Sequence, residues 1–170
     1  MGDGMARVGR HDRGEMMRAS LLPGQFMDIA MAEARAAAGR GEVPVGAALS
    51  GPGGVLLARA GNRVEEWRDP SAHAEMQVMR AAVHQLGGER LGGCVLYVTL
   101  EPCPMCAAAA THFRLGRIVF GAYDPKGGGV EHGPRVFSHP RCLHRPEVVG
   151  GVREREAGAL LRDFFRHLRA

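Results

Sequence analysis

Apolar and polar residues alternate along the chain with two periods, one typical of helices and the other typical of strands. Apolar positions at helical spacing predict helices over residues 25–40, 72–86, 103–113 and 154–169. Short apolar runs bounded by turn residues predict strands at 45–50, 55–60, 95–100, 118–122 and 148–150, the first two joined as a hairpin. This order of elements indicates a three-layer α/β domain with a mixed sheet.

Other stretches lack either period. Residues 1–22 are rich in Gly, Arg, Asp and Met, and we predict that they form a disordered N-terminal extension. Residues 23–170 are then expected to form a single domain, because their length suits one hydrophobic core. Residues 62–70 are expected to be a loop. The segment 124–145 is rich in Gly, His and Pro and is predicted to be a long loop, a kind that is usually functional or mobile.

Composition narrows the class of protein only in part. The formal net charge is +4, which suits a polyanionic partner, although a solvated arginine-rich surface explains it equally well. The 4 cysteines follow no secretory apolar segment, and two of them form a C-x-x-C sequence. No apolar run approaches the roughly 18 residues that a membrane span needs. We therefore expect a soluble, cytoplasmic protein whose reduced cysteines serve a metal or redox chemistry.

The strongest chemical signal is the sequence H-A-E at 73–75 combined with P-C-P-M-C at 102–106. Catalytic zinc keeps one of its four positions for water, and His73, Cys103 and Cys106 can supply the other three. Both sequences begin predicted helices, whose N-termini favour thiolates. Glu75 is expected beside the metal, as the acid/base that takes a proton from water and returns one to a leaving amine. This combination is the established signature of zinc-dependent deaminases.

Two other interpretations of the cysteines have to be weighed. A C-x-x-C sequence alone is more typical of a structural zinc site or a redox pair. A structural site needs a fourth protein ligand, and the sequence has no second C-x-x-C. Cys94 and Cys142 are isolated and are interpreted as core thiols. The complete pattern of His73, Glu75 and the cysteine pair therefore favours a catalytic site.

At these residues the chain resembles the cytidine deaminase superfamily and, within it, the bacterial tRNA-specific adenosine deaminases. The similarity extends from about Phe26 to Leu168 and is carried by residues 42–47, 62–63, 69–76, 96–106, 119–128 and 160–165. It implies a cytidine deaminase-like fold, an α/β/α sandwich around a central mixed five-stranded sheet. It also implies a Zn²⁺ cofactor and a hydrolytic reaction, in which wobble adenosine of a tRNA anticodon becomes inosine and ammonia is released.

The resemblance further implies roles for residues at matching positions. His73, Cys103 and Cys106 would hold zinc, and Glu75 would move protons. The implied substrate-binding residues are Asn62 and Ala74 at the flipped base, Pro44, Asp124 beside the flanking nucleotides, and Phe164 and Phe165 at the anticodon stem-loop. The resemblance also implies a homodimer in which the partner chain helps to bind the tRNA.

Structural roles stay open for several of these residues. Asn62 could cap a loop after its strand, and Asp124 with Pro125 could form only a turn. Phe164 and Phe165 have the spacing of a core stripe, so packing is expected for at least one ring.

Two alternative functions also stay open. The first is a deaminase of a free base or nucleotide of guanine or cytosine type, since guanine deaminases carry a similar P-C-P-M-C sequence. The second is a non-catalytic zinc-stabilised RNA-binding module, against which Glu75 argues, because such a module needs no acid/base carboxylate. One segment also differs from the resemblance. Residues 130–142 depart from the sequence common in tRNA-specific adenosine deaminases. This difference weakens the assignment of a tRNA substrate more than the assignment of deamination.

Overall fold

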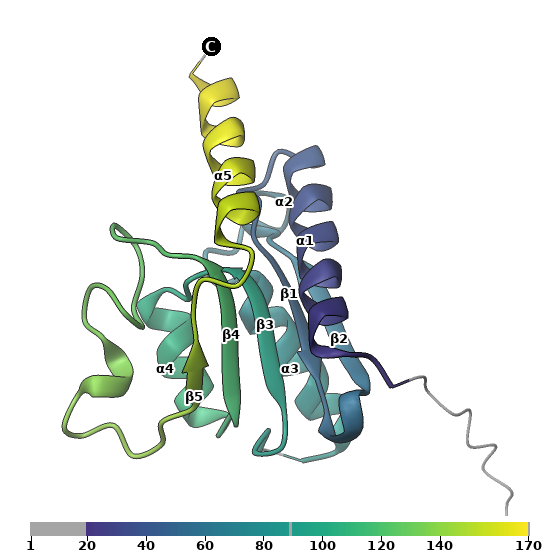
Figure 1. The fold of residues 1–170 in the computed structure, drawn as a ribbon, viewed down its shortest axis with the longest axis vertical. Coiled ribbons are helices and arrows are strands. Elements are labelled where there is room, and N and C mark those ends of the chain that lie inside the picture. Colours follow the sequence, from purple (N-terminus) through teal and green to yellow (C-terminus); the bar gives the residue numbers. More distant parts are fainter. Residues whose placement is uncertain (1–19, 89, 170) are drawn as a thin grey trace, which may run out of the picture.

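The central element is a five-stranded sheet between two layers of helices, seen in a computed structural model that describes residues 20–88 and 90–169 (Figure 1). The strands are β1 (Gly46–Ser50), β2 (Leu56–Gly61), β3 (Val95–Leu100), β4 (Arg117–Ala122) and β5 (Glu147–Val149). Their order is β2-β1-β3-β4-β5. β1 is antiparallel to β2 and β3, whereas β3, β4 and β5 are parallel. The predicted three-layer fold with a mixed sheet is confirmed.

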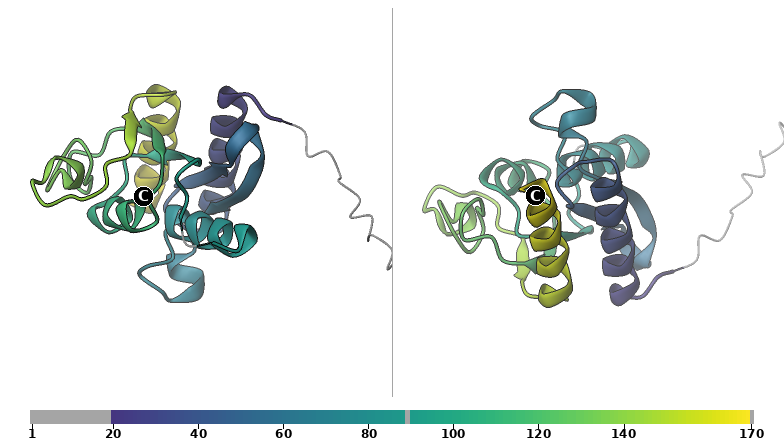
Figure 2. Two further views of the ribbon diagram at one scale, coloured as in Figure 1. Left: turned by 90° about the horizontal axis from the view of Figure 1, so that it is seen from below. Right: turned by 90° about the horizontal axis from the view of Figure 1, so that it is seen from above.

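Helices cover both faces of the sheet (Figure 2). α1 (Pro23–Gly39) and α5 (Glu154–Leu168) lie on one face, and α3 (Ala74–Leu86) and α4 (Pro104–His112) lie on the other. Neighbouring residues of β3 point to opposite faces, so Leu96 packs with α3 and α4, and Tyr97 packs with α1. The Tyr97 ring stacks on Phe26 with the ring centroids 5.0 Å apart.

The predicted helices and strands are confirmed within about two residues at most ends, the usual uncertainty of such bounds. Two short helical elements lie inside segments that we predicted as loops. α2 (Val64–Trp67) is a single turn within residues 62–70, and η2 (Val136–Ser138) lies within residues 124–145. Both are too short to produce an apolar period in the sequence, which is why the pattern missed them.

The predicted N-terminal extension over residues 1–22 lies mostly outside the described residues. Within its last residues, the Ser20 hydroxyl donates to the carbonyl of Gly53 at 2.6 Å, and the Leu21 N–H donates to the carbonyl of Gly54 at 2.9 Å. Ser20 and Leu21 therefore contact the turn between β1 and β2 immediately before α1 begins at Pro23.

The last helix, α5, is attached to α1 by ion pairs. Arg153 pairs with Asp28 and Glu156, and Arg35 also pairs with Glu156. The C-terminal part of α5 extends beyond the sheet (Figure 1), and the side chain of Leu168 is correspondingly exposed. Although α5 is amphipathic, neither it nor any other helix in the described part of the chain could span a membrane.

Candidate active site

The three predicted metal ligands converge at the N-termini of α3 and α4. His73 is the N-cap of α3, Cys103 is the N-cap of α4, and Cys106 lies in the first turn of α4. His73 Nδ1 is 3.6 Å from Cys103 Sγ and 3.5 Å from Cys106 Sγ. The three ligand atoms lie within 4.8 Å of one another, and no other His, Cys, Asp or Glu group in residues 20–88 and 90–169 converges in this way.

The local sequence explains why both thiols face the same point. Pro104 occupies the first position of α4, where the missing N–H costs no hydrogen bond. Cys103 then acts as the helix cap, and its sulfur accepts the backbone N–H of Cys106 at 3.5 Å. A spacing of three residues in the first helical turn therefore brings both sulfurs to the same side.

The surroundings of the cysteine pair favour a thiolate. A hydrogen bond from the Cys106 thiol lowers the pKa of Cys103 to about 4, and His73 acts in the same direction against the effect of burial. The same hydrogen bond, together with burial, raises the pKa of Cys106. Contact with Cys103 raises the pKa of His73. With a cation bound, both cysteines would be thiolates, because a coordinating thiol is deprotonated.

Glu75 lies in the first turn of α3, beside the three ligands. It is 3% exposed, and burial raises its pKa to about 7. Among the described residues, its Oε2 is the one buried side-chain oxygen or nitrogen without a hydrogen-bond partner. A buried oxygen normally has a partner, so this atom is available to a group that enters the site, such as a water molecule.

His73, Glu75 and Cys103 line a cavity of about 620 Å³. Three of the predicted substrate-binding residues, Asn62, Asp124 and Phe164, also line it. The other three, Pro44, Ala74 and Phe165, are not among its lining residues. The residues that complete the lining are Gly41, Glu42, Val43, Val45, Val64, Glu65, Leu100, Glu101, Gly127 and Leu168.

Asn62 is oriented by the N-terminus of α3. Its Oδ1 accepts the backbone N–H of Ala74 at 3.0 Å, and Asn62 is itself buried. Since Oδ1 is engaged, the group that Asn62 can offer inside the cavity is the amide Nδ2, which is a hydrogen-bond donor. The pairing also engages the Ala74 N–H, which we predicted as a contact to the base.

A buried carboxylate holds one wall of the cavity. Glu42 is 1% exposed, and its two oxygens accept the backbone N–H groups of Glu65 at 3.2 Å and Glu66 at 2.9 Å. These groups belong to the first turn of α2, whose free N–H groups favour an anion. This contact explains how a helix of four residues is stable here.

A second buried carboxylate, Glu101, lies between β3 and Cys103. Burial alone would raise the pKa of Glu101, but hydrogen bonds from Asp124, His132 and Glu131 outweigh it, so the pKa is lowered. The sequence did not single out Glu42 or Glu101 as residues of the cavity. One signal in the sequence could have found them. Each is an acidic residue close to a strand that is predicted to be buried, and a buried charge needs hydrogen-bond or ionic partners.

The donor set of the site is chemically selective. One imidazole nitrogen and two thiol sulfurs suit zinc, whereas Mg²⁺ and Ca²⁺ prefer oxygen ligands. His73, Cys103 and Cys106 could therefore hold a borderline-soft cation such as zinc. Glu75, beside them and without another partner for Oε2, could move protons to and from a water molecule at the same point.

Comparison with known proteins identifies the class. Residues 23–122 match the family described as the cytidine and deoxycytidylate deaminase zinc-binding region, and the chain belongs to this family. Relatives that match most of the chain have names that specify a substrate. The tRNA-specific adenosine deaminase of Agrobacterium fabrum (strain C58 / ATCC 33970) is 54% identical over 144 residues, which cover 85% of this chain and 94% of the relative.

Solved structures of deaminases are also similar to this chain in fold and sequence. One comes from work on A-to-I editing by tRNA:A34 deaminases at the wobble position of transfer RNA. It has a TM-score of 0.79 and 52% identity, and covers 81% of this chain and 99% of the solved chain. The guanine deaminase from Bacillus subtilis is less similar. Its TM-score is 0.57 with 32% identity, covering 61% of this chain and 66% of that one.

Proposed function

We propose that this chain is a zinc-dependent deaminase that converts adenosine to inosine at the wobble position of a tRNA anticodon. The observation that carries the proposal is the meeting of His73, Cys103 and Cys106 with the unpartnered Oε2 of Glu75 beside one cavity. The 54% identity with a tRNA-specific adenosine deaminase supports the choice of substrate.

The cofactor is proposed to be Zn²⁺, held by His73, Cys103 and Cys106. The mixed nitrogen and sulfur donor set supports zinc, and three protein ligands leave one of its usual four positions for water or substrate. When bound, zinc supplies Lewis-acid activation of water at neutral pH.

Glu75 is proposed to move the protons of the reaction. Its carboxylate takes a proton from the water that attacks C6 of adenine and delivers it to N1, and it then carries the remaining hydroxyl proton to the exocyclic N6. The C6–N6 bond breaks and ammonia leaves, while the water oxygen stays on C6 as the carbonyl of inosine and the first proton stays on N1. The position of Glu75 supports this role, because Oε2 is buried beside the ligands and has no hydrogen-bond partner within residues 20–88 and 90–169.

Binding of the base is proposed to depend on Asn62. Its Nδ2 would donate to a ring nitrogen of the base, since Oδ1 is engaged by Ala74. Asp124 and Phe164 line the same cavity and are proposed to contact the flanking nucleotides and the anticodon loop. For Ala74 an indirect role is proposed, as the group that orients Asn62.

The partner is proposed to be the tRNA anticodon stem-loop, which would place the protein in the cytoplasm. The outer part of α5 supports an RNA contact, because Phe165 lies there with Arg162, Arg166 and Arg169 around a surface groove. Arginine and aromatic side chains together suit phosphates and unstacked bases. Following the resemblance to tRNA-specific adenosine deaminases, a homodimer is also proposed, for which light scattering after size exclusion is the direct measurement.

One assay tests the substrate. Purified protein is incubated with an anticodon stem-loop that contains a wobble adenosine and, separately, with guanine, cytosine and cytidine, and inosine and ammonia are measured. We expect one ammonia for each inosine with the stem-loop and none with the free compounds. Turnover of guanine without turnover of the stem-loop would contradict the proposal and favour the free-base alternative. A stem-loop with guanosine at the wobble position is the matched negative control.

A further inference from the structure

Glu101 joins two parts of the active-site cavity that are distant in sequence. It follows β3 directly and precedes Pro102 and Cys103, so its backbone is part of the segment that carries a predicted metal ligand. Its side chain points away from that segment toward the loop after β4, and it is fully buried there. Both Glu101 and the loop residues Asp124 and Gly127 line the cavity.

The carboxylate of Glu101 accepts hydrogen bonds from five donors of this loop. Oε1 accepts the backbone N–H groups of Val130 at 3.2 Å, Glu131 at 2.8 Å and His132 at 2.9 Å. Oε2 accepts the backbone N–H of Asp124 at 2.9 Å and the ring Nδ1–H of His132 at 2.8 Å. Consecutive N–H groups around one anion form a nest, an arrangement that fixes the backbone.

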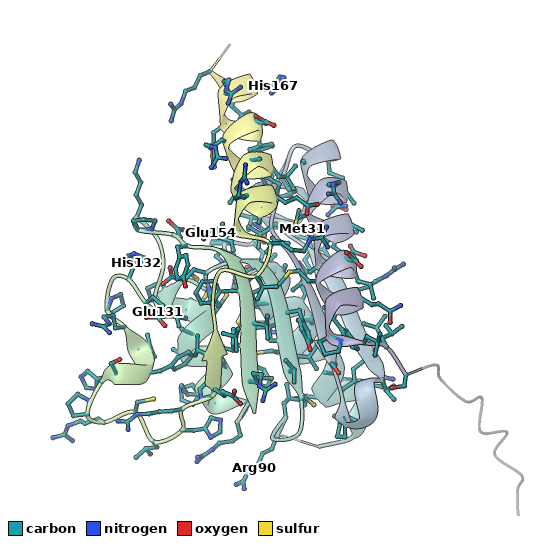
Figure 3. All side chains as sticks on the ribbon, in the orientation of Figure 1. Met31, Arg90, Glu131, His132, Glu154 and His167 are labelled. Atoms are coloured by element: carbon teal, nitrogen blue, oxygen red, sulfur yellow. The ribbon has the colours of Figure 1, made fainter. Side chains whose placement is uncertain are left out.

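His132 is the one of these partners that also donates through its side chain. Figure 3 shows it beside Glu131 on the loop beyond β4, and its side chain is 36% exposed. Its ring also meets Tyr123 edge-on, with the centroids 6.1 Å apart. The ring therefore connects the fully buried carboxylate to a partly exposed position on the loop.

The loop approaches Glu101 so closely that side chains would not fit at two positions. A Cβ at Gly128 would lie 2.5 Å from Glu101 Oε1, and a Cβ at Gly129 would lie 2.5 Å from the nitrogen of Pro104. The Gly129 N–H donates to the carbonyl of Pro102 at 2.8 Å. The glycines thus permit a direct backbone contact between the loop and the segment of Cys103.

We propose that Glu101 is a positioning residue for the deamination proposed above, on which this inference rests. Its carboxylate fixes residues 124–132 against the start of α4 and so sets the wall of the cavity that receives the nucleotides beside the reacting base. Glu101 itself does not transfer protons in this role. Glu75 is held by α3, which lies outside this loop, so its position does not depend on the Glu101 contacts.

A purely structural role would lower stability without changing how a folded enzyme binds its substrate. A positioning role predicts a local loosening of residues 124–132 and a higher KM, with kcat and zinc content largely retained. Two measurements distinguish these roles. Kinetic constants measured well below the unfolding temperature show whether the folded enzyme binds its substrate less well, and hydrogen exchange resolved along the sequence shows whether residues 124–132 loosen.

The principal experiment compares Glu101→Gln with wild type and with Glu147→Gln, a matched change at an exposed residue of β5. For Glu101→Gln we expect KM for the anticodon stem-loop to rise about tenfold, with kcat within about threefold of wild type. Deuterium uptake should rise in residues 124–132 and not in β1. The Glu147→Gln variant should match wild type in KM and in uptake within the loop.

Two results would overturn the proposal. One is a folded, zinc-loaded Glu101→Gln protein with wild-type KM and wild-type uptake in the loop. The other is a fall in kcat with unchanged KM, which would mean that Glu101 acts through the metal ligands. If wild type turns over a free base instead of the stem-loop, the proposed function fails. The exchange experiment then tests by itself whether Glu101 fixes residues 124–132, because a free base has no flanking nucleotides to contact that wall.

A second variant keeps the test decisive if Glu101→Gln does not fold. His132→Ala removes one of the donors from a partly exposed side chain and leaves the backbone donors in place. We expect a rise in KM of about two- to threefold and a smaller increase in uptake over residues 124–132. Wild-type values for both would count against the positioning role.

Discussion

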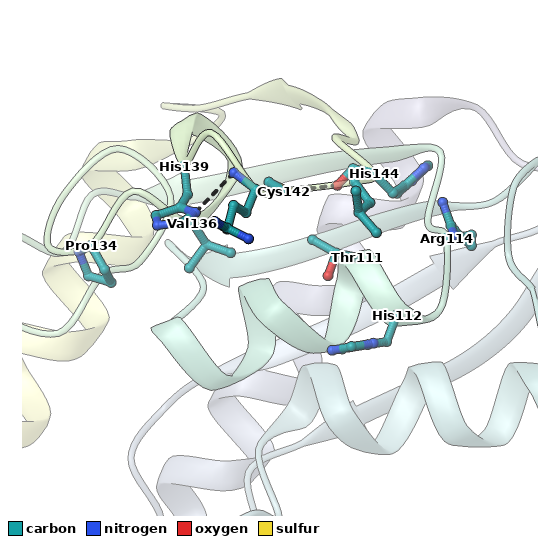
Figure 4. A pocket seen from close by; sticks show the side chains of 10 residues that line it. Thr111, His112, Arg114, Pro134, Val136, His139, Cys142 and His144 are labelled. Atoms are coloured by element: carbon teal, nitrogen blue, oxygen red, sulfur yellow. Dashed lines mark hydrogen bonds between the residues drawn. The ribbon is translucent and has the colours of Figure 1, made fainter.

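The two ends of α4 each border a cavity that contains histidine and cysteine, yet only one of them forms a candidate metal site. At the N-terminal end, His73, Cys103 and Cys106 bring their ligand atoms within 4.8 Å of one another. At the C-terminal end, a cavity of about 420 Å³ lies between α4 and residues 134–144 (Figure 4). Its lining includes Cys142 and His139, but these do not belong to any converging group among the described residues.

Three side chains of the second cavity form hydrogen bonds with backbone groups. The Cys142 thiol donates to the carbonyl of His144 at 3.1 Å, and the His144 ring donates through Nε2 to the carbonyl of Leu115 at 2.6 Å. The His139 ring accepts the N–H of Arg141 at 3.2 Å. At the other end of the helix, Glu75 Oε2 lacks a partner. Convergence of the ligand atoms beside Glu75, and not the residue types alone, distinguishes the two cavities.

The helix itself adds to the contrast. A helix N-terminus favours negative charge, which suits the thiolates that Cys103 and Cys106 would contribute to a metal site. The C-terminus favours positive charge, and there His112, Arg114 and Arg141 line the second cavity. The same residue type therefore meets opposite electrostatic surroundings at the two ends of α4.

The largest effect is expected from removing a cysteine at each end. Cys106→Ala should reduce bound zinc from about one ion per chain to near zero and abolish deamination, because two ligands remain. Cys142→Ala, the matched control, should retain zinc and activity. Metal analysis and the stem-loop assay check both variants. Equal loss of zinc in the two would contradict the distinction between the cavities.

The next effect concerns the proton-transfer group. Glu75→Gln should retain zinc and the fold and lower kcat by about 10²–10⁴-fold, the usual contribution of general acid–base catalysis. Single-turnover rates with the stem-loop measure this, with Glu147→Gln as the control. A zinc-loaded Glu75→Gln enzyme with full activity would refute the proposed mechanism.

An intermediate effect is expected for the residue proposed to contact the base. Asn62→Ala removes the Nδ2 donor and leaves the Ala74 N–H without its present acceptor. We expect kcat/KM to fall about 10- to 100-fold while zinc is retained, since a loss of 1.4 kcal/mol is about tenfold. His139→Ala, in the second cavity, should keep wild-type kcat/KM. Similar kcat/KM values for the two variants would argue against a role of Asn62 in substrate binding.

The smallest effect should be one of stability alone. His144→Ala removes the hydrogen bond to Leu115, which should lower the free energy of unfolding by about 0.5–1.5 kcal/mol. For a chain of this size, each kcal/mol corresponds to roughly 2–4 °C in Tm. Calorimetry and zinc analysis measure the two properties together. Loss of zinc in this variant would mean that the second cavity does affect the metal site.

Much of the fold could be predicted from the apolar periods alone, because the long elements each bury one face. The strand at 95–100 is confirmed at both ends as β3, and the hairpin around Gly51 is confirmed as β1 and β2. α2 could not be predicted, because its stability depends on Glu42, which is distant in sequence.

The candidate site was predictable where chemistry is carried by residue type and spacing. The convergence of His73 with the cysteine pair follows from two helix starts and a recognisable pattern. Contacts that depend on the path of the backbone were not predictable. The five donors to Glu101 are mostly main-chain N–H groups, which no pattern of side chains reveals. Pro44 and Phe165 lie next to residues that line the cavity but do not line it themselves.

The short edge strand β5 also affects how the protein behaves among copies of itself. A long, flat, apolar edge strand offers unpaired N–H and C=O groups to any neighbouring strand and so promotes aggregation. β5 has only 3 residues, and its exposed Glu147 is paired with Arg117 of β4 at 2.7 Å. Gly150 and Gly151 follow at once and end the strand. This edge of the sheet therefore gives an incoming strand little length to pair with and a charge to bury.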